Sequence, residues 1–270
     1  MMTMIEAEQP DGVIICVGPE AHAELAPRVL RMGIPVYTEK PPAPDARGAL
    51  EVARVARESG ALCMTAFKKR YSAAYVRAKE FIREFPPKDL YSLSVDYCSA
   101  QYRNHSPRNL FLLDFAIHMI DLAHFLFGEP ESVFAFAKGE DAFAVSVRFA
   151  NGAVGSLNLN DGRSFGIPTE EVEITARGGN FMSIHNSSCW KIARNGQCAE
   201  WREPPTFVSG GDSGNDTGHL AELAAFILAI QGQGETKSPI FESYKTMVFY
   251  EAIRESAKLG IPVRTRFETI

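Results

Sequence analysis

Over the first part of the chain, short apolar runs alternate with segments of helical periodicity. The runs cover residues 12–17, 35–38 and 61–67. The first is rich in β-branched residues, as expected for a strand that is buried on both faces. Two segments have apolar side chains on one helical face, residues 20–32 and the segment that begins at Asp45. Gly33 and Gly60 are the expected ends of these two helices. This alternation predicts parallel βαβ units.

Beyond residue 70, polar and apolar positions alternate, which is typical of half-exposed strands, as in residues 91–97. Asn151-Gly152 and Asn195-Gly196 lie between such runs and predict two type I′ hairpins. The pattern therefore predicts an α/β protein. Residues 1–70 are expected to form part of a Rossmann-type parallel sheet, and residues 71–270 an α+β domain with a large, mostly antiparallel sheet. The last helices are expected to cross back to the first domain.

One predicted strand pair is more apolar than a solvated sheet face requires. Phe134, Phe136, Val145 and Val147 are expected to share the second face of the antiparallel sheet. A face of this kind is explained by burial in a homo-oligomer or by packing against the chain's own helices. We expect at least a dimer.

Composition and charge exclude several classes of protein. The chain has 28 basic and 33 acidic residues, a net charge of −5, and no block of like charge. This balance argues against nucleic acid or an anionic membrane as the main partner. No apolar run is long enough for a membrane span, and no secretory signal is visible. Five cysteines without a Cys-x-x-Cys pair favour reduced thiols in the cytoplasm.

Candidate chemistry lies where the predicted parallel strands end, because ligands of open parallel sheets bind beyond the carboxyl ends of the strands. Residues 18–22 follow the first strand, and Glu39, Lys40 and Pro41 follow the second. A partly buried lysine there can polarise a hydroxyl or carbonyl group, although its position alone favours a solvated lysine. Arg70, just past the third strand, is expected either to line the cleft or to be solvated.

Three ionisable residues interrupt an apolar stretch that is predicted to be one helix. Asp114, His118 and Asp121 have i, i+4, i+7 spacing and would share one stripe of it. Carboxylates beside the imidazole would fix its tautomer and suit it to general-base work. A hydrogen-bonded core histidine between surface aspartates is equally compatible. A divalent metal, with His105 and His124 nearby in sequence, is less favoured because no His-Glu-x-x-His motif occurs.

Taken together, these segments resemble the glucose-fructose oxidoreductase/inositol dehydrogenase family of NAD(P)-dependent oxidoreductases. The resemblance covers essentially the whole chain, and its motifs are residues 11–19 with His22, residues 33–41 with Glu-Lys-Pro, Arg70, the Asp-x-x-x-His-x-x-Asp of residues 114–121, and residues 128–130. It implies a Rossmann domain, then an α/β domain whose large sheet often mediates dimers or tetramers.

The resemblance also implies a reaction and a set of site residues. The cofactor would be NAD or NADP, and hydride transfer would occur at a secondary hydroxyl of a sugar, cyclitol or related polyol. Lys40 would contact the nicotinamide ribose and the substrate hydroxyl, His118 would take the hydroxyl proton, and Asp114 would hold the substrate or orient His118. Arg70, Asp114 and His118 would bind substrate, and no metal is expected. The residues that would border the cofactor are Val17, Gly18, Pro19, His22, Glu39 and Lys40.

One departure from the family pattern concerns the cofactor. The sequence contains no Gly-x-Gly-x-x-Gly turn, and residues 4–10 look like the helix before the fourth Rossmann strand. We expect about two βα units to be absent, and with them the diphosphate cradle and the residue that separates NAD from NADP. The strand at residues 12–17 would then be an exposed edge. The alternative function is a non-catalytic or regulatory protein that binds a sugar or a partner.

Overall fold

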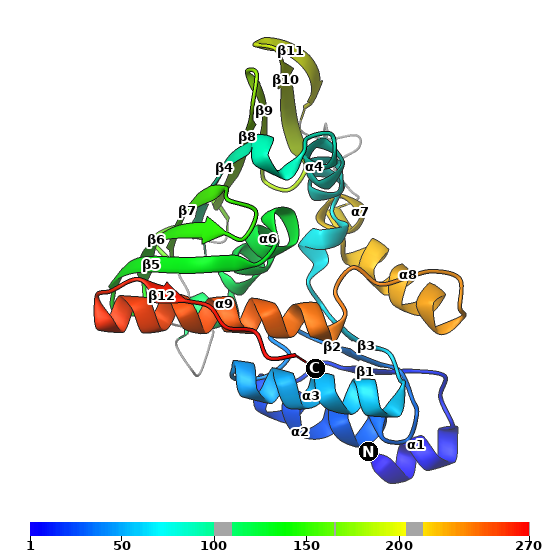
Figure 1. Cartoon of the computed structure of the whole chain (residues 1–270). Helices are drawn as coiled ribbons and strands as arrows, with labels where there is room; N and C mark the ends of the chain where they lie inside the picture. Colours follow the sequence, from blue (N-terminus) through cyan, green and yellow to red (C-terminus); the bar gives the residue numbers. More distant parts are fainter. Residues whose placement is uncertain (100–109, 165, 204–212, 270) are drawn as a thin grey trace. The chain divides into compact units, whose positions relative to one another are not determined.

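The computed structural model divides the chain into two compact units (Figure 1). It describes residues 1–99, 110–164, 166–203 and 213–269. The first unit comprises residues 1–67, 220–248 and 267–270, and the second comprises residues 68–219 and 249–266. The chain therefore passes more than once between the units.

The first unit is built around a parallel sheet in the order β1-β2-β3. The strands are β1 (Val13–Ile15), β2 (Val36–Thr38) and β3 (Cys63–Thr65). The helices that precede and connect them are α1 (Met2–Glu8), α2 (Pro19–Leu30) and α3 (Ala46–Ser59). The predicted alternation of strand and helix is confirmed. Each strand is shorter than its apolar run, because the flanking residues leave the hydrogen-bonded ladder and continue as loops.

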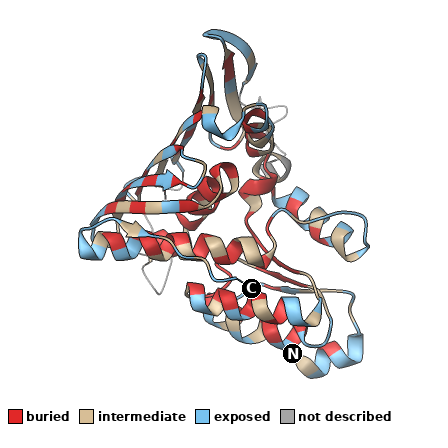
Figure 2. Cartoon of the chain, viewed as in Figure 1, coloured by how far each residue is buried: buried red, intermediate tan, exposed pale blue. Residues whose placement is uncertain are grey.

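The two faces of this sheet pack against different helices. Ile15 and Val36 belong to a buried core that they share with residues of α2 and α3, drawn in red in Figure 2. Tyr37 follows Val36 in the strand, so its side chain lies on the opposite face. There its ring contacts Phe226 of α8 (His219–Ile230), with 5.6 Å between the ring centroids. The sheet is therefore covered on both sides.

Local rules place the helix ends correctly. The side chain of Asp45 accepts a hydrogen bond of 2.7 Å from the backbone N–H of Gly48, which caps α3 as predicted. Gly33 and Gly60 follow α2 and α3 with φ of 76° and 68°. Glycine adopts this left-handed conformation without steric cost, so both predicted helix ends are confirmed.

The second unit contains a nine-stranded sheet in the order β11-β10-β9-β8-β4-β7-β6-β5-β12. Neighbouring strands are antiparallel except for β4 and β7. The strands are β4 (Leu90–Cys98), β5 (Pro130–Lys138), β6 (Ala142–Phe149), β7 (Val154–Asn160), β8 (Thr169–Ala176), β9 (Asn180–His185), β10 (Cys189–Arg194), β11 (Gln197–Arg202) and β12 (Val263–Arg264). The predicted fold class, a parallel sheet followed by a large and mostly antiparallel one, is confirmed.

Helical segments complete the second unit. They are η1 (Lys68–Tyr71), α4 (Ala73–Arg83), η2 (Pro87–Asp89), α5 (Phe111–Asp114), α6 (Ile117–Phe127), α7 (Ser213–Thr217) and the second half of α9 (Ile240–Leu259). Helix α6 is almost wholly buried and contacts β4, η1 and α4. No helix within the described ranges combines the length and the apolar character that a bilayer span requires.

The faces of the strand pair β5–β6 correct one expectation. Val145 and Val147 lie opposite Ala135 and Val133, and all four side chains are buried. Phe136 lies opposite Ala144 on the other face, where 65% of its surface is exposed. The prediction that the two phenylalanines and the two valines share a face is therefore wrong. Alternation within one strand does not fix how two strands are aligned, and a shift of one residue exchanges the faces.

The two Asn-Gly hairpins differ. Asn195 and Gly196 both have positive φ, 50° and 76°, which confirms the type I′ turn between β10 and β11. At the other hairpin, the Phe149 N–H donates to the Ala153 carbonyl over 2.9 Å, so the loop between them has a third residue. The side chain of Asn151 accepts from the Ala153 N–H there. The prediction of a two-residue turn at Asn151-Gly152 is wrong.

Candidate active site

The loop after β1 presents exposed backbone at the carboxyl end of the parallel sheet. Cys16, Val17 and Gly18 are all exposed, and Gly18 is the N-cap of α2. A methyl group added to Gly18 would have one described neighbour within 4 Å, the Oε2 atom of Glu20 at 3.4 Å. This loop is therefore open on its outer side, as the approach of a ligand requires.

The loop after β2 places a carboxylate and an ammonium group side by side in the sequence. Glu39 and Lys40 are both half-buried, and the Lys40 N–H donates to Oε2 of Glu39 over 3.1 Å. A carboxylate accepts hydrogen bonds from ribose hydroxyls, and an ammonium group donates them to a hydroxyl oxygen. The residues beyond β2 thus offer a hydrogen-bond acceptor and a hydrogen-bond donor next to each other in the sequence.

His22 lies inside the first unit, and its expected place at the border of the cofactor stays a prediction. Its side chain is fully buried, and Pro19, another residue expected to border the cofactor, is also buried. The His22 ring interacts through Nδ1 with the Pro41 carbonyl at 2.9 Å and through Nε2 with the Val17 N–H at 3.3 Å. The ring therefore contacts the backbone of both loops.

In the second unit, the predicted single helix through the Asp-x-x-x-His-x-x-Asp motif is interrupted. The Ala116 N–H donates to the carbonyl of Phe111, five residues back, over 3.1 Å, so one turn is wider than an α-helical turn. Helix α5 ends at Asp114, and α6 begins at Ile117. Asp114 is buried and His118 is half-buried in the first turn of α6. Widened turns of this kind are frequent at functional sites.

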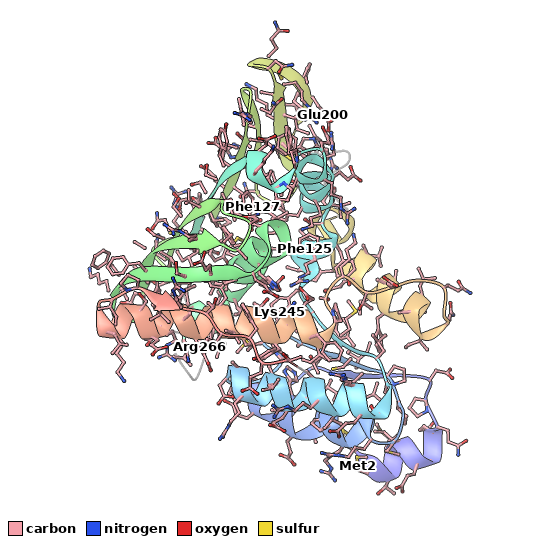
Figure 3. All side chains as sticks on the ribbon, in the orientation of Figure 1. Met2, Phe125, Phe127, Glu200, Lys245 and Arg266 are labelled. Atoms are coloured by element: carbon pink, nitrogen blue, oxygen red, sulfur yellow. The ribbon has the colours of Figure 1, made fainter. Side chains whose placement is uncertain are left out.

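Asp121 has a buried partner that its spacing in the sequence does not predict. Its two carboxylate oxygens accept hydrogen bonds of 2.7 and 2.9 Å from the guanidinium of Arg70, and the side chains are 0% and 2% exposed. The guanidinium also lies 5.2 Å from the ring centre of Phe125, which Figure 3 labels on α6. Arg70 is therefore not solvated, which excludes one of its two expected environments. Its expected contact with a substrate stays a prediction.

A second buried ion pair was not predicted from the sequence. The ammonium group of Lys69 donates to the carboxylate of Glu170 and, over 3.1 Å, to the hydroxyl of Ser187. Tyr75 donates to the same carboxylate over 2.7 Å. Burial acts to raise the pKa of Glu170, but the charge of Lys69 and these hydrogen bonds outweigh it, so the pKa is lowered. Glu170 therefore stays ionised in the folded protein.

The two pairs together explain the position of η1. The consecutive residues Lys69 and Arg70 are both buried, and each is bound by a carboxylate that is distant in the sequence. In the sequence, Lys68-Lys69-Arg70 looks like a solvated charged run. No local pattern reveals the partners, because they come from β8 and α6.

The residues that the structure describes contain no set of side chains arranged to hold a metal ion. No group of three or more histidine, cysteine or acidic side chains is arranged there to hold an ion. His124, one residue of the metal alternative, is buried on α6. His105, the other, falls outside the described residues.

A parallel dinucleotide-type sheet, followed by an α+β unit with a large and mostly antiparallel sheet, defines a class of two-domain oxidoreductases. Residues 1–67 match the family model for the NAD-binding Rossmann fold of the Gfo/Idh/MocA oxidoreductases, and residues 96–265 match the model for their C-terminal α/β domain. The chain belongs to this oxidoreductase family. Its first 67 residues are part of the family's NAD-binding domain.

Individual proteins agree with this membership. The rhizopine catabolism protein MocA of Rhizobium meliloti is 27% identical over 169 residues, which are 60% of this chain and 52% of that protein. Inositol 2-dehydrogenase of Rhizobium meliloti strain 1021 is 29% identical over 131 residues, 47% of this chain and 40% of that protein. The chain thus spans about half the length, or less, of these two curated relatives in the matched regions.

Among solved structures, levoglucosan dehydrogenase in complex with NADH and levoglucosan is similar, with a TM-score of 0.85. The identity is 21%, and the match covers 98% of this chain and 82% of that chain. At this identity the similarity shows the fold. It extends over both units of the chain.

Proposed function

We propose that this protein is an NAD(P)-dependent dehydrogenase that oxidises a secondary hydroxyl group of a sugar, cyclitol or related polyol. The proposal is supported by the family membership and by two residues, Lys40 in the first unit and His118 in the second. The lysine lies two residues beyond strand β2 of the NAD-binding domain, and the histidine follows a widened turn of the second unit. Inositol and levoglucosan, named for two similar proteins, both carry secondary hydroxyl groups.

The residues beyond β1 and β2 fit the nicotinamide end of the cofactor. The open backbone of residues 16–18 and the side chains of Glu39 and Lys40 would hold it, because they supply donors and acceptors for an amide and a ribose. The diphosphate end is typically held by a Gly-x-Gly-x-x-Gly turn, a pattern that does not occur in the 270 residues. When bound, the cofactor accepts a hydride from the carbinol carbon.

Three side chains would act on the substrate in the proposed oxidation. The imidazole of His118 accepts the proton of the substrate hydroxyl. The ammonium group of Lys40 donates a hydrogen bond to the same oxygen and stabilises the negative charge that develops as the proton leaves. The carboxylate of Asp114 holds a neighbouring substrate hydroxyl or orients His118. In the reverse reaction, His118 returns the proton.

The proposal is tested by binding and turnover of the full chain. Titration with NADH and with NADPH, followed by nicotinamide fluorescence, is expected to show saturable binding of at least one of them. With the matching oxidised cofactor, a panel of inositols and pyranose sugars is expected to yield absorbance of the reduced nicotinamide for at least one polyol. Binding without turnover of any polyol would favour a binding or regulatory protein instead.

We further propose that the protein is a homo-oligomer that assembles through the open face of its large sheet. Phe134 and Phe136 lie on this face with 4.8 Å between their ring centroids, and Phe136 and Val154 are more than half exposed. Exposed aromatic and β-branched residues on a sheet face are typical of an interface.

The five free cysteines are typical of a reducing compartment, which supports the cytoplasm as the location.

Light scattering of the wild-type chain at micromolar concentration is expected to give at least the mass of a dimer. Phe136→Asp is expected to shift the population towards the monomer, because it buries a charge in the proposed interface. Leu259→Asp, at an exposed apolar residue on α9, is the matched control and is expected to keep the wild-type mass. A monomeric wild-type chain would contradict the proposed assembly.

A further inference from the structure

The ring of His22 connects the two loops that follow β1 and β2. The last ladder bond between these strands runs from the Glu39 N–H to the Ile15 carbonyl over 3.0 Å. Two residues further along each segment, the His22 ring contacts the Val17 N–H and the Pro41 carbonyl. The ring thus bridges the loops where the backbone ladder has ended.

The two contacts require opposite roles of the two ring nitrogens. A backbone N–H can only donate, so Nε2 of His22 must accept the hydrogen bond from Val17. A backbone carbonyl can only accept, so Nδ1 must carry the proton and donate it to Pro41. The neutral tautomer with its proton on Nδ1 meets both requirements. The other neutral tautomer meets neither, and the protonated ring loses the contact to Val17.

Both contacts act on segments of the proposed site. Val17 belongs to the exposed loop after β1, whose backbone we propose to contact the nicotinamide end of the cofactor. Pro41 directly follows Lys40, so its carbonyl group is one peptide unit from the lysine that we propose to act on the substrate hydroxyl. The buried ring lies behind both segments and fixes their spacing from inside the first unit.

We infer that His22 is a positioning residue, which holds the backbone at Val17 and the Lys40–Pro41 segment in the arrangement that binding of the nicotinamide end requires. The inference rests on the proposed function. Because His22 is fully buried, it acts through the backbone that it holds. A small side chain at this position would leave the Val17 N–H and the Pro41 carbonyl without the ring that joins them.

The structural part of this inference is tested by NMR on the wild-type chain and on His22→Ala. In the wild type, the imidazole nitrogen signals are expected to show the proton on Nδ1. In His22→Ala, hydrogen exchange of the Val17 amide is expected to speed up about tenfold, the scale of one net hydrogen bond. The Val36 amide, bonded to the Leu62 carbonyl inside the sheet, is expected to keep its protection. A proton on Nε2, or unchanged exchange at Val17, would overturn the inference.

The functional part is tested by the affinity for NADH or NADPH, whichever the wild type binds. His22→Ala is expected to raise the dissociation constant by about tenfold. His22→Gln is expected to restore part of the affinity, because its amide group also has a donor and an acceptor. Val29→Ala, at a buried core residue of the same helix, is the control for packing loss and is expected to keep the wild-type affinity.

The outcomes separate the two proposals. A wild-type chain that binds neither cofactor would contradict the proposed function. A wild-type chain that binds, with an unchanged affinity in His22→Ala, would contradict only the role of His22. An equal loss of affinity in Val29→Ala and His22→Ala, without rescue by His22→Gln, would show that general packing and not positioning explains the effect.

Discussion

Replacing His118 by asparagine is expected to lower kcat by about 10²- to 10⁴-fold, the usual effect of removing a general base. Asparagine keeps a hydrogen-bonding side chain of similar polarity but cannot take the hydroxyl proton at neutral pH. Lys40→Met is expected to cause a comparable loss, since methionine has a similar length and no charge to stabilise the developing alkoxide. Both are measured from the initial rate of nicotinamide reduction at saturating cofactor and substrate.

The matched control is His124→Asn, the same substitution six residues further along the same helix. His124 is buried and has no proposed role in the reaction, so kcat is expected to stay near the wild-type value. Thermal unfolding of each variant separates loss of chemistry from loss of fold. Full activity in His118→Asn would exclude this histidine as the base. Activity that depends on an added metal ion and disappears with a chelator would favour the metal alternative.

The features that the sequence predicts correctly depend on neighbouring residues. Asp45 and Gly60 delimit α3 because a capping carboxylate and a left-handed glycine act within one turn of the helix. Asn195-Gly196 determines its hairpin in the same way, since both residues tolerate positive φ. The order of strands and helices in the first unit follows from the apolar period alone.

The features that the sequence does not predict depend on distant residues. Arg70 and Asp121 are separated by 51 positions, and Lys69 and Glu170 by 101, so no spacing rule connects them. The same holds for the faces of β5 and β6, which the alignment of two strands determines. In the Asp-x-x-x-His-x-x-Asp motif, the i, i+4, i+7 spacing suggests one stripe, but the widened turn interrupts the helix between the first two residues. Asp121 binds Arg70 and is therefore occupied within the second unit.

The buried pair of Arg70 and Asp121 gives the largest expected effect on stability. Asp121→Asn keeps the shape of the side chain but removes the negative charge that faces the buried guanidinium. Breaking a buried ion pair from one side costs about 3–5 kcal/mol, because the remaining charge stays in a medium of low polarity. We expect a decrease of this size in the free energy of unfolding of the second unit, measured by urea denaturation.

A double variant distinguishes the cost of an isolated charge from the contribution of the pair. In Arg70→Met/Asp121→Leu both charges are absent and the space is filled by apolar atoms, so the decrease in the free energy of unfolding is expected to be far smaller than in Asp121→Asn. Glu140→Gln, in the exposed pair with Arg254, is the surface control, with an expected effect below about 1 kcal/mol. Because Asp121 belongs to the helix that begins beside His118, Asp121→Asn is also expected to lower kcat in the folded fraction. An effect of Asp121→Asn no larger than that of Glu140→Gln would show that this pair does not hold α6 against η1.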